Sequence, residues 1–100
     1  MTSEDQQSIT AWQDDVFGPT TPWLAYCRMA DEVAELEEVF TRGRDIDHNK
    51  SLEECADVYI MLVRVAEALG GDLQAEVDRK MAINRARSWD VDGNGHGQHR

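Results

Sequence analysis

The stretches Glu32-Val33-Ala34-Glu35 and Glu54-Cys55-Ala56-Asp57 decide the fold, and both have an acidic residue at the first and the fourth position. Each lies within a segment whose apolar residues recur at helical spacing. Residues three apart on a helix share a face, with Cβ atoms roughly 5 to 6 Å apart, so each stretch aims two carboxylates the same way. If the two helices pack antiparallel, the carboxylates converge, and such oxygen ligands suit Mg²⁺ or Mn²⁺.

Around these stretches the apolar periodicity predicts an all-α protein, a four-helix bundle-like protomer. Capping-box patterns begin at Ser3 and at Ser51, Thr21-Pro22 has the cap and first-turn proline of a helix start, and Asp72 caps a last helix. We expect helices over residues 4–15, 22–41, 51–69 and 72–88, with a loop over 42–50. No strand is expected. The predicted domain covers residues 1–89, and residues 90–100 are predicted to be a mobile C-terminal tail.

The length of 100 residues predicts a single domain with a thin hydrophobic core. Because a chain of this size buries only about 60 to 70% of its unfolded surface, contacts that cover more apolar area would stabilise it. We therefore expect a homo-oligomer, either a homodimer or a homotetramer.

The charge distribution argues against two classes of partner. There are 20 acidic and 10 basic residues, a net charge of −10, which disfavours simple electrostatic binding to nucleic acid or to an anionic membrane. No apolar run approaches the roughly 18 residues of a membrane span, and the polar N-terminus lacks a signal-peptide core. Cys27 and Cys55 lack metal-ligand spacing, so we interpret them as reduced packing residues and expect a cytoplasmic protein.

The acidic stretches have an ordinary explanation, the solvated faces of a helical bundle. Two features argue against it. Both stretches lie at the edge of an apolar stripe, and neither has Lys or Arg four residues further on to neutralise it. Unpaired carboxylates beside buried surface raise each other's proton affinity unless a cation lies among them.

A second polar set follows in the last helix. Lys80, Asn84 and Arg87 lie at positions that put three long donors on one side of that helix, and Lys and Arg are the expected donors to phosphate oxygens. A solvated stripe is the alternative explanation. Trp12 and Trp23 have two interpretations as well, stacking on a base or packing in a core or interface.

These motifs together resemble a known family. The pattern Glu32-x-x-Glu35-Leu36, then Glu53-Glu54-x-x-Asp57, then Lys80-x-x-x-Asn84-x-x-Arg87-x-Trp89 is similar to that of the MazG-like, all-α nucleoside triphosphate pyrophosphohydrolases. It is most similar to their short dATP/dGTP-diphosphohydrolase-like branch. Trp12-x-x-x-x-Phe17-Gly18 and Asp92-Gly93 followed by a histidine resemble that branch too, so the resemblance runs from Trp12 to about His96.

The resemblance implies hydrolysis of a (deoxy)nucleoside triphosphate to the monophosphate and pyrophosphate. It implies that Mg²⁺, or Mn²⁺ in its place, is held by the catalytic residues Glu32, Glu35, Glu54 and Asp57. It also implies that Lys80, Asn84 and Arg87 contact the phosphates or the sugar, and that helices of two subunits pack together. The C-terminal stretch is richer in Gly and His than the pattern leads us to expect, so His96 and His99 are interpreted as tail residues.

Two other functions fit parts of the pattern. A di-iron carboxylate bundle also uses inward-facing Glu residues, but it needs Glu-x-x-His on two helices, and here the stretches end in Glu35 and Asp57. The other alternative is a noncatalytic helical module for oligomeric interaction or regulation. It predicts no stoichiometric site for Mg²⁺ or Mn²⁺.

Overall fold

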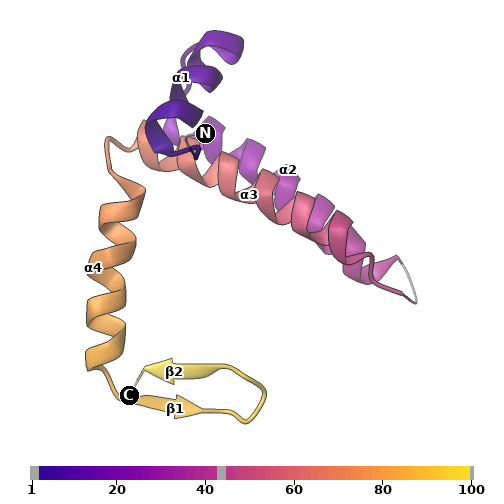
Figure 1. Cartoon of the computed structure of the whole chain (residues 1–100), viewed down its shortest axis with the longest axis vertical. Helices are drawn as coiled ribbons and strands as arrows, with labels where there is room; N and C mark the ends of the chain where they lie inside the picture. The colour runs from indigo at the N-terminus through magenta and orange to yellow at the C-terminus, as the bar shows by residue number, and fades with distance from the viewer. Residues whose placement is uncertain (1–2, 43–44, 100) are drawn as a thin grey trace.

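A computed structural model describes residues 3–42 and 45–99 of the chain. It contains four helices and a short two-stranded sheet (Figure 1), and it confirms the all-α class. The helices are α1 (Gln6–Phe17), α2 (Pro22–Thr41), α3 (His48–Ala68) and α4 (Leu73–Ala86), and the strands are β1 (Trp89–Val91) and β2 (Gly97–His99).

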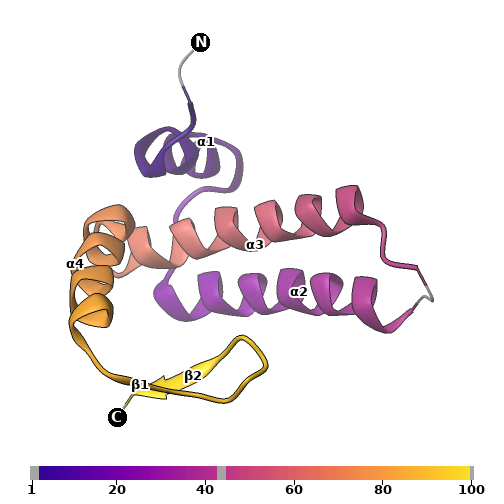
Figure 2. The ribbon, with the colours of Figure 1, turned by 60° about the horizontal axis from the view of Figure 1, so that its bottom comes forward.

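The centre of the fold is the pair of long helices α2 and α3, which lie side by side along most of their length (Figure 2). Helix α2 begins as the sequence predicts: Thr21 caps it by accepting a hydrogen bond from the Leu24 amide at 3.2 Å, and Pro22 occupies the first turn. Its bounds match the predicted range of 22–41. Among the described residues, Ala25 and Val63 are the buried hydrophobic side chains, one from each helix of the pair.

Helix α3 begins one turn earlier than the sequence predicts. Asp47 is its N-cap and accepts from the Lys50 amide at 3.1 Å, whereas Ser51 lies in the first turn and donates its hydroxyl to the Asp47 carbonyl at 2.8 Å. The predicted capping box at Ser51 is therefore wrong, because Asp47 provides a competing cap one turn upstream. Part of the predicted loop, residues 43–44, lies outside the described residues.

Helix α1 crosses the pair on the side of α3. Its cap is the reciprocal pair Asp5 and Ser8 and not Ser3, so the helix spans Gln6–Phe17 where residues 4–15 were expected. Gly18, at a φ of 77°, ends it as predicted. The buried Gln13 donates to the Ile60 carbonyl at 3.0 Å and thereby fixes α1 on α3.

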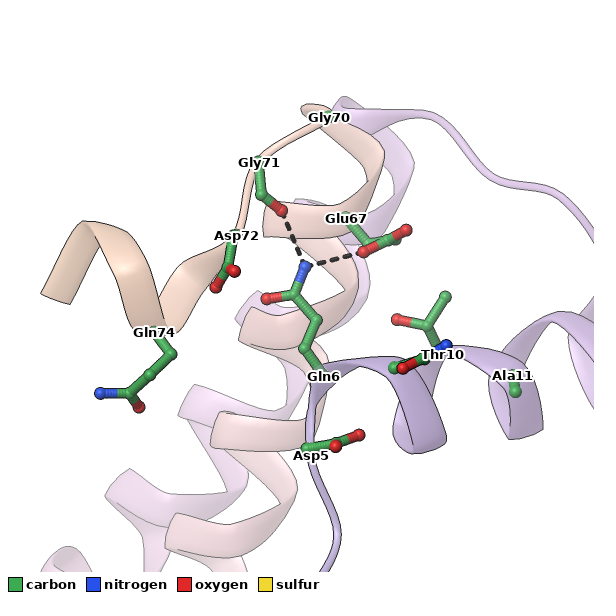
Figure 3. Close-up of a pocket in the computed structure, with 10 residues that line it drawn as sticks. Asp5, Gln6, Thr10, Ala11, Glu67, Gly70, Gly71, Asp72 and Gln74 are labelled. Atoms are coloured by element: carbon green, nitrogen blue, oxygen red, sulfur yellow. Dashed lines mark hydrogen bonds between the residues drawn. The ribbon is translucent and has the colours of Figure 1, made fainter. Parts of the chain in front are cut away.

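Gln6 joins α1 to the turn that leads into α4 (Figure 3). Its side-chain amide nitrogen donates to Glu67 at 2.7 Å and to the Gly71 carbonyl at 2.8 Å, and its oxygen accepts from the Leu73 amide at 2.7 Å. These contacts border a cavity of about 690 Å³. Asp72 caps α4 as predicted, but the helix ends at Ala86, two residues before the expected end at Ser88.

The C-terminal segment contains strands, which the sequence analysis did not expect. Residues 89–91 and 97–99 pair antiparallel, with Trp89 opposite His99. Asp92 closes the connection by accepting from the amides of Asn94 at 2.8 Å and His96 at 3.2 Å, which is an Asx turn. Strands of three residues are too short to show an alternating pattern, so the prediction of a strandless tail is wrong; its mobility and the domain boundary at residue 89 stay predictions.

The protomer leaves two apolar stripes exposed on the central pair. Trp23, Tyr26, Val33 and Phe40 follow one face of α2, and Leu52, Tyr59, Leu62 and Leu69 follow one face of α3. The radius of gyration is 16.2 Å, against about 13 Å for a compact domain of this length. The predicted apolar faces of these helices therefore divide between the contact within the pair and the molecular surface.

Candidate metal centre

The two acidic stretches meet across the α2–α3 interface. Glu32 of α2 and Glu54 and Asp57 of α3 each offer a carboxylate oxygen, and these oxygens lie within 4.8 Å of one another. The antiparallel arrangement brings the middle of α2 beside the first half of α3 (Figure 2). Three of the four carboxylates that the spacing predicted to converge therefore come together within a single chain.

Glu35 adjoins this cluster from the next turn of α2. A side-chain hydrogen bond with Glu32, together with the negative charge of Glu32, raises the pKa of Glu35. The pKa of Asp57 is raised as well, first by burial and then by the charges of Glu32 and Glu54. Each shift shows that the carboxylates destabilise one another's charged form, which is the condition that a bound cation relieves.

Two of the carboxylates are buried, and one of their oxygens has no hydrogen-bond partner among the described residues. Glu32 and Glu54 are 7% and 5% exposed, so both are almost completely removed from water. The Oε2 atom of Glu54 is buried and has no hydrogen-bond partner among the described residues. Since a buried carboxylate oxygen without a partner is costly, its position beside Glu32 and Asp57 fits a divalent cation coordinated by oxygen.

Two basic side chains that sequence reasoning missed lie on the cluster. The Arg28 guanidinium is 2.7 Å from Oε1 of Glu32, and the Lys50 ammonium is 2.9 Å from Oε1 of Glu54. The expectation that the stretches lack a neutralising base is therefore wrong, because the bases precede the acids by four residues and only the following positions were considered. The signal was readable, since base-x-x-x-Glu occurs in both helices.

A cavity of about 530 Å³ opens beside the carboxylates. It lies between the C-terminal half of α2 and the start of α3, and it contains both acidic and basic groups. Its lining residues are Glu35, Glu38, Val39, Arg42, Asp45, Lys50 and Glu54. A cavity of this size has room for a small ligand next to the cluster.

The protomer does not bring the predicted phosphate donors to this cluster. Lys80 and Asn84 lie on α4, and Arg87 is its C-cap in an extended conformation, so the three do not continue one helical face. Figure 2 shows α4 at the end of the pair where α3 finishes, whereas Glu54 and Asp57 lie in the first half of α3.

The remaining candidates are not members of the carboxylate cluster. Trp12 of α1 packs edge-on against Phe17 with ring centroids 5.5 Å apart, and it borders a largely apolar cavity with Tyr59 and Ile60 of α3. His96 lies in the β1–β2 connection, and His99 is near Trp89, with ring centroids 6.0 Å apart. Cys27 and Cys55 are both free thiols.

The fold and the carboxylate cluster define a class, the all-α metal-binding hydrolases, and comparison with known proteins narrows it. A dATP/dGTP diphosphohydrolase of Cyanophage S-2L is 33% identical over 97 residues, which are 97% of this chain and 86% of that protein. The chain thus belongs to the MazG-like pyrophosphohydrolases that include the dATP/dGTP diphosphohydrolases. No family model matches the chain.

Two further comparisons agree with this family. A dATP/dGTP diphosphohydrolase of Salmonella phage PMBT28 is 34% identical over 94 residues; these are 94% of this chain, which spans only 30% of the length of that relative. The solved structure of a Cyanophage S-2L MazG-like pyrophosphohydrolase, bound to dGDP and three catalytic Mn²⁺ ions per active site, superposes with a TM-score of 0.71 at 32% identity. The match covers 95% of this chain and 92% of that one. Membership of an enzyme family sets aside the interpretation as a noncatalytic module.

A membrane-spanning helix is not among the elements described: no helix within residues 3–42 and 45–99 combines the length and the apolar character needed to cross a bilayer.

Proposed function

We propose that the chain hydrolyses a (deoxy)nucleoside triphosphate to the nucleoside monophosphate and pyrophosphate, using Mg²⁺ or Mn²⁺ held by Glu32, Glu35, Glu54 and Asp57. One observation carries the proposal. Carboxylate oxygens from both helices lie within 4.8 Å of one another, and Glu54, one of the residues that provide them, has a buried oxygen, Oε2, without a hydrogen-bond partner among the described residues. When bound, the cation would polarise phosphate oxygens and lower the pKa of a coordinated water.

The residues of the chain have separate roles in this proposal. Glu32 and Glu54, buried in the α2–α3 interface, hold fixed positions because the packing of the pair restricts their rotamers. Glu35 and Asp57 are more exposed, and their raised pKa values make them the carboxylates that accept a proton most readily. The adjacent cavity would receive the phosphates.

The donors on α4 enter this proposal from a second subunit. We propose that Lys80, Asn84 and Arg87 contact the phosphates or sugar across a homodimer or homotetramer interface, and that Trp12 stacks on the base. The exposed apolar stripes on α2 and α3 support an assembly, since they are the surfaces that a stable oligomer covers. The substrates named for the relatives belong to those proteins, and an assay with a panel of triphosphates determines the base preference of this chain.

Pyrophosphate release tests the proposal directly. Canonical deoxynucleoside and ribonucleoside triphosphates are incubated with the protein and Mg²⁺ or Mn²⁺, and the wild type is compared with Glu54→Gln. We expect a loss of roughly 100-fold or more in the variant, because disturbing even the outer shell of a metal site costs about 10- to 100-fold.

Glu53→Gln is the matched control. Glu53 precedes Glu54 in α3 and its side chain is 73% exposed, so this change removes the same charge from outside the cluster. Its activity should stay near that of the wild type, and both variants should keep the helical circular dichroism of the wild type. Full activity of Glu54→Gln would rule out the assignment of this carboxylate.

A further inference from the structure

Two ion pairs on the carboxylate cluster have the same construction. In each, a base lies one helical turn before a buried glutamate: Arg28 before Glu32 at 2.7 Å, and Lys50 before Glu54 at 2.9 Å. The side chains of the glutamates are only 9% and 7% exposed, whereas those of Arg28 and Lys50 are 54% and 55% exposed. The acids are therefore held by packing, and the bases are the partners that are free to move.

The bases and a divalent cation compete for the same carboxylates. Lys50 contacts Oε1 of Glu54, and Oε2 of that carboxylate is the buried atom without a hydrogen-bond partner. An ammonium that remained there would lie a few ångströms from any cation bound at Oε2, and like charges at such separations repel in partly buried surroundings. The flexible stem of lysine allows the ammonium to leave at little cost.

Only one of the two bases, Lys50, lines the cavity beside the cluster and has an alternative position there. Lys50 lines the 530 Å³ cavity together with Glu35 and Glu54, and Arg28 does not line it. Among the described residues that line this cavity, carboxylates outnumber the basic groups, which are Arg42 and Lys50. An anionic ligand inside it would need cationic partners, and an ammonium released from Glu54 is the nearest of these to the cluster.

We propose that Lys50 is an exchanging counter-cation: it pairs with Glu54 in the metal-free protein and with a phosphate oxygen of the nucleotide once the carboxylates hold a divalent cation. The inference rests on the proposed function and adds a substrate contact to it. Arg28 has only the first of these two roles: it pairs with Glu32 until a divalent cation replaces it, and it does not contact the nucleotide.

The first half is tested by titrating Mn²⁺ alone into the metal-free protein by calorimetry. Lys50→Gln and Arg28→Gln should each bind Mn²⁺ more tightly, by up to about fivefold, because each variant lacks a half-exposed base that competes with the cation for a carboxylate. Arg79→Gln is the control, since Arg79 pairs with Glu76 on α4, away from the cluster. Unchanged or weaker Mn²⁺ binding in Lys50→Gln would overturn the exchange.

The second half is tested by titrating inorganic pyrophosphate into the Mn²⁺-saturated proteins. Lys50→Gln should bind pyrophosphate about tenfold more weakly, since a charge-assisted hydrogen bond is lost. Arg28→Gln and Arg79→Gln should match the wild type, and Lys50→Arg should restore most of the affinity. Equal pyrophosphate affinity in the wild type and Lys50→Gln would overturn the phosphate contact.

The wild type separates this inference from the proposed function. Absence of stoichiometric Mn²⁺ binding by the wild type would remove the metal site itself. Binding by the wild type, with no difference among the variants, would reject only the role of Lys50.

Discussion

The carboxylates at the site differ in their burial and in whether a basic side chain pairs with them. Glu32 and Glu54 are buried and paired with bases, so their charges are compensated in the metal-free protein. Glu35 and Asp57 form no ion pair of this kind among the described residues. Contact with Glu32 raises the pKa of Glu35, and burial, followed by the charges of Glu32 and Glu54, raises the pKa of Asp57. Two costs are therefore separate: the pKa values of Glu35 and Asp57 are perturbed, and Oε2 of Glu54 is buried without a hydrogen-bond partner among the described residues.

This asymmetry predicts how stability depends on pH. Folding raises the pKa of Glu35 and of Asp57 above the ordinary values of 4.5 and 3.8. The folded state thus binds protons more tightly than the unfolded one, so the stability contributed by these groups is present below the ordinary values and is lost as pH rises through the raised ones. Acidifying the protein, with chelator present, through the raised pKa values toward the ordinary ones should raise its melting temperature relative to a Glu35→Gln/Asp57→Asn variant.

Saturating Mn²⁺ should reverse the sign of that difference. Protons then compete with the cation for the same oxygens, so acidification should lower the melting temperature of the wild type more than that of the variant. Thermal melts of both proteins, with chelator and with Mn²⁺, provide the comparison. Parallel pH profiles in all conditions would show that these two carboxylates do not titrate as a cluster.

The acidic residues of the cluster could be predicted from the sequence, whereas the two basic residues that pair with them were missed. The acidic residues at helical spacing identified Glu32, Glu54 and Asp57 because periodicity alone fixes which side chains share a face. Arg28 and Lys50 were missed because only positions after the acids were compared. Lys50 was also placed in a loop, which hid its relation to Glu54 until the true start of α3 was known.

Among the elements, the caps decided which boundaries could be predicted. Pro22 at the first helical position selects Thr21 over Thr20 as the cap, Asp72 directly follows Gly70-Gly71, and the helices begin there as expected. The starts of α1 and α3 each have two candidate caps within a turn or so, and the sequence does not rank Asp5 against Ser3 or Asp47 against Ser51. The hairpin was missed because its order comes from the Asx turn at Asp92 and not from an apolar pattern.

One side chain connects three of these elements, and its removal should be measurable. Gln6 makes hydrogen bonds to Glu67, Gly71 and Leu73, joining α1 to the α3–α4 turn. Gln6→Ala should lower the free energy of unfolding by about 1 to 3 kcal/mol, since it leaves partly buried groups unpaired. Chemical denaturation measures the change.

Gln7→Ala is the matched control for Gln6→Ala. Gln7 is the next residue of α1 and is exposed, so its replacement alters helix propensity equally without touching the turn. We expect this control to stay within about 0.5 kcal/mol of the wild type. Equal stability of the two variants would show that the contacts of Gln6 do not hold α4 in place.

For the whole molecule, the position of α4 and the exposed stripes point to the same conclusion. The predicted donors Lys80 and Asn84 extend away from the acidic cluster on a helix without buried residues. The stripes on α2 and α3 leave large apolar side chains in water, which is unusual over so much of a small monomer. Packing a second copy against these stripes would cover them, and it is also the proposed route by which α4 donors reach a cluster.

The last prediction tests whether the α3 stripe is the assembly surface. Leu52 and Leu69 are 67% and 68% exposed and lie at the two ends of this stripe. The double variant Leu52→Glu/Leu69→Glu should lower the mass measured by light scattering toward that of the 11.3 kDa protomer, because burying charges in an apolar interface is unfavourable. Gln7→Glu adds a negative charge to an exposed position of α1, outside the α3 stripe, and should leave the mass unchanged. If the donors on α4 act across the interface, the double variant should also lose pyrophosphate release while it retains Mn²⁺ binding, since the carboxylate cluster lies within one protomer. An unchanged mass would move the interface elsewhere, and full activity in a monomeric variant would remove α4 of a second subunit from the site.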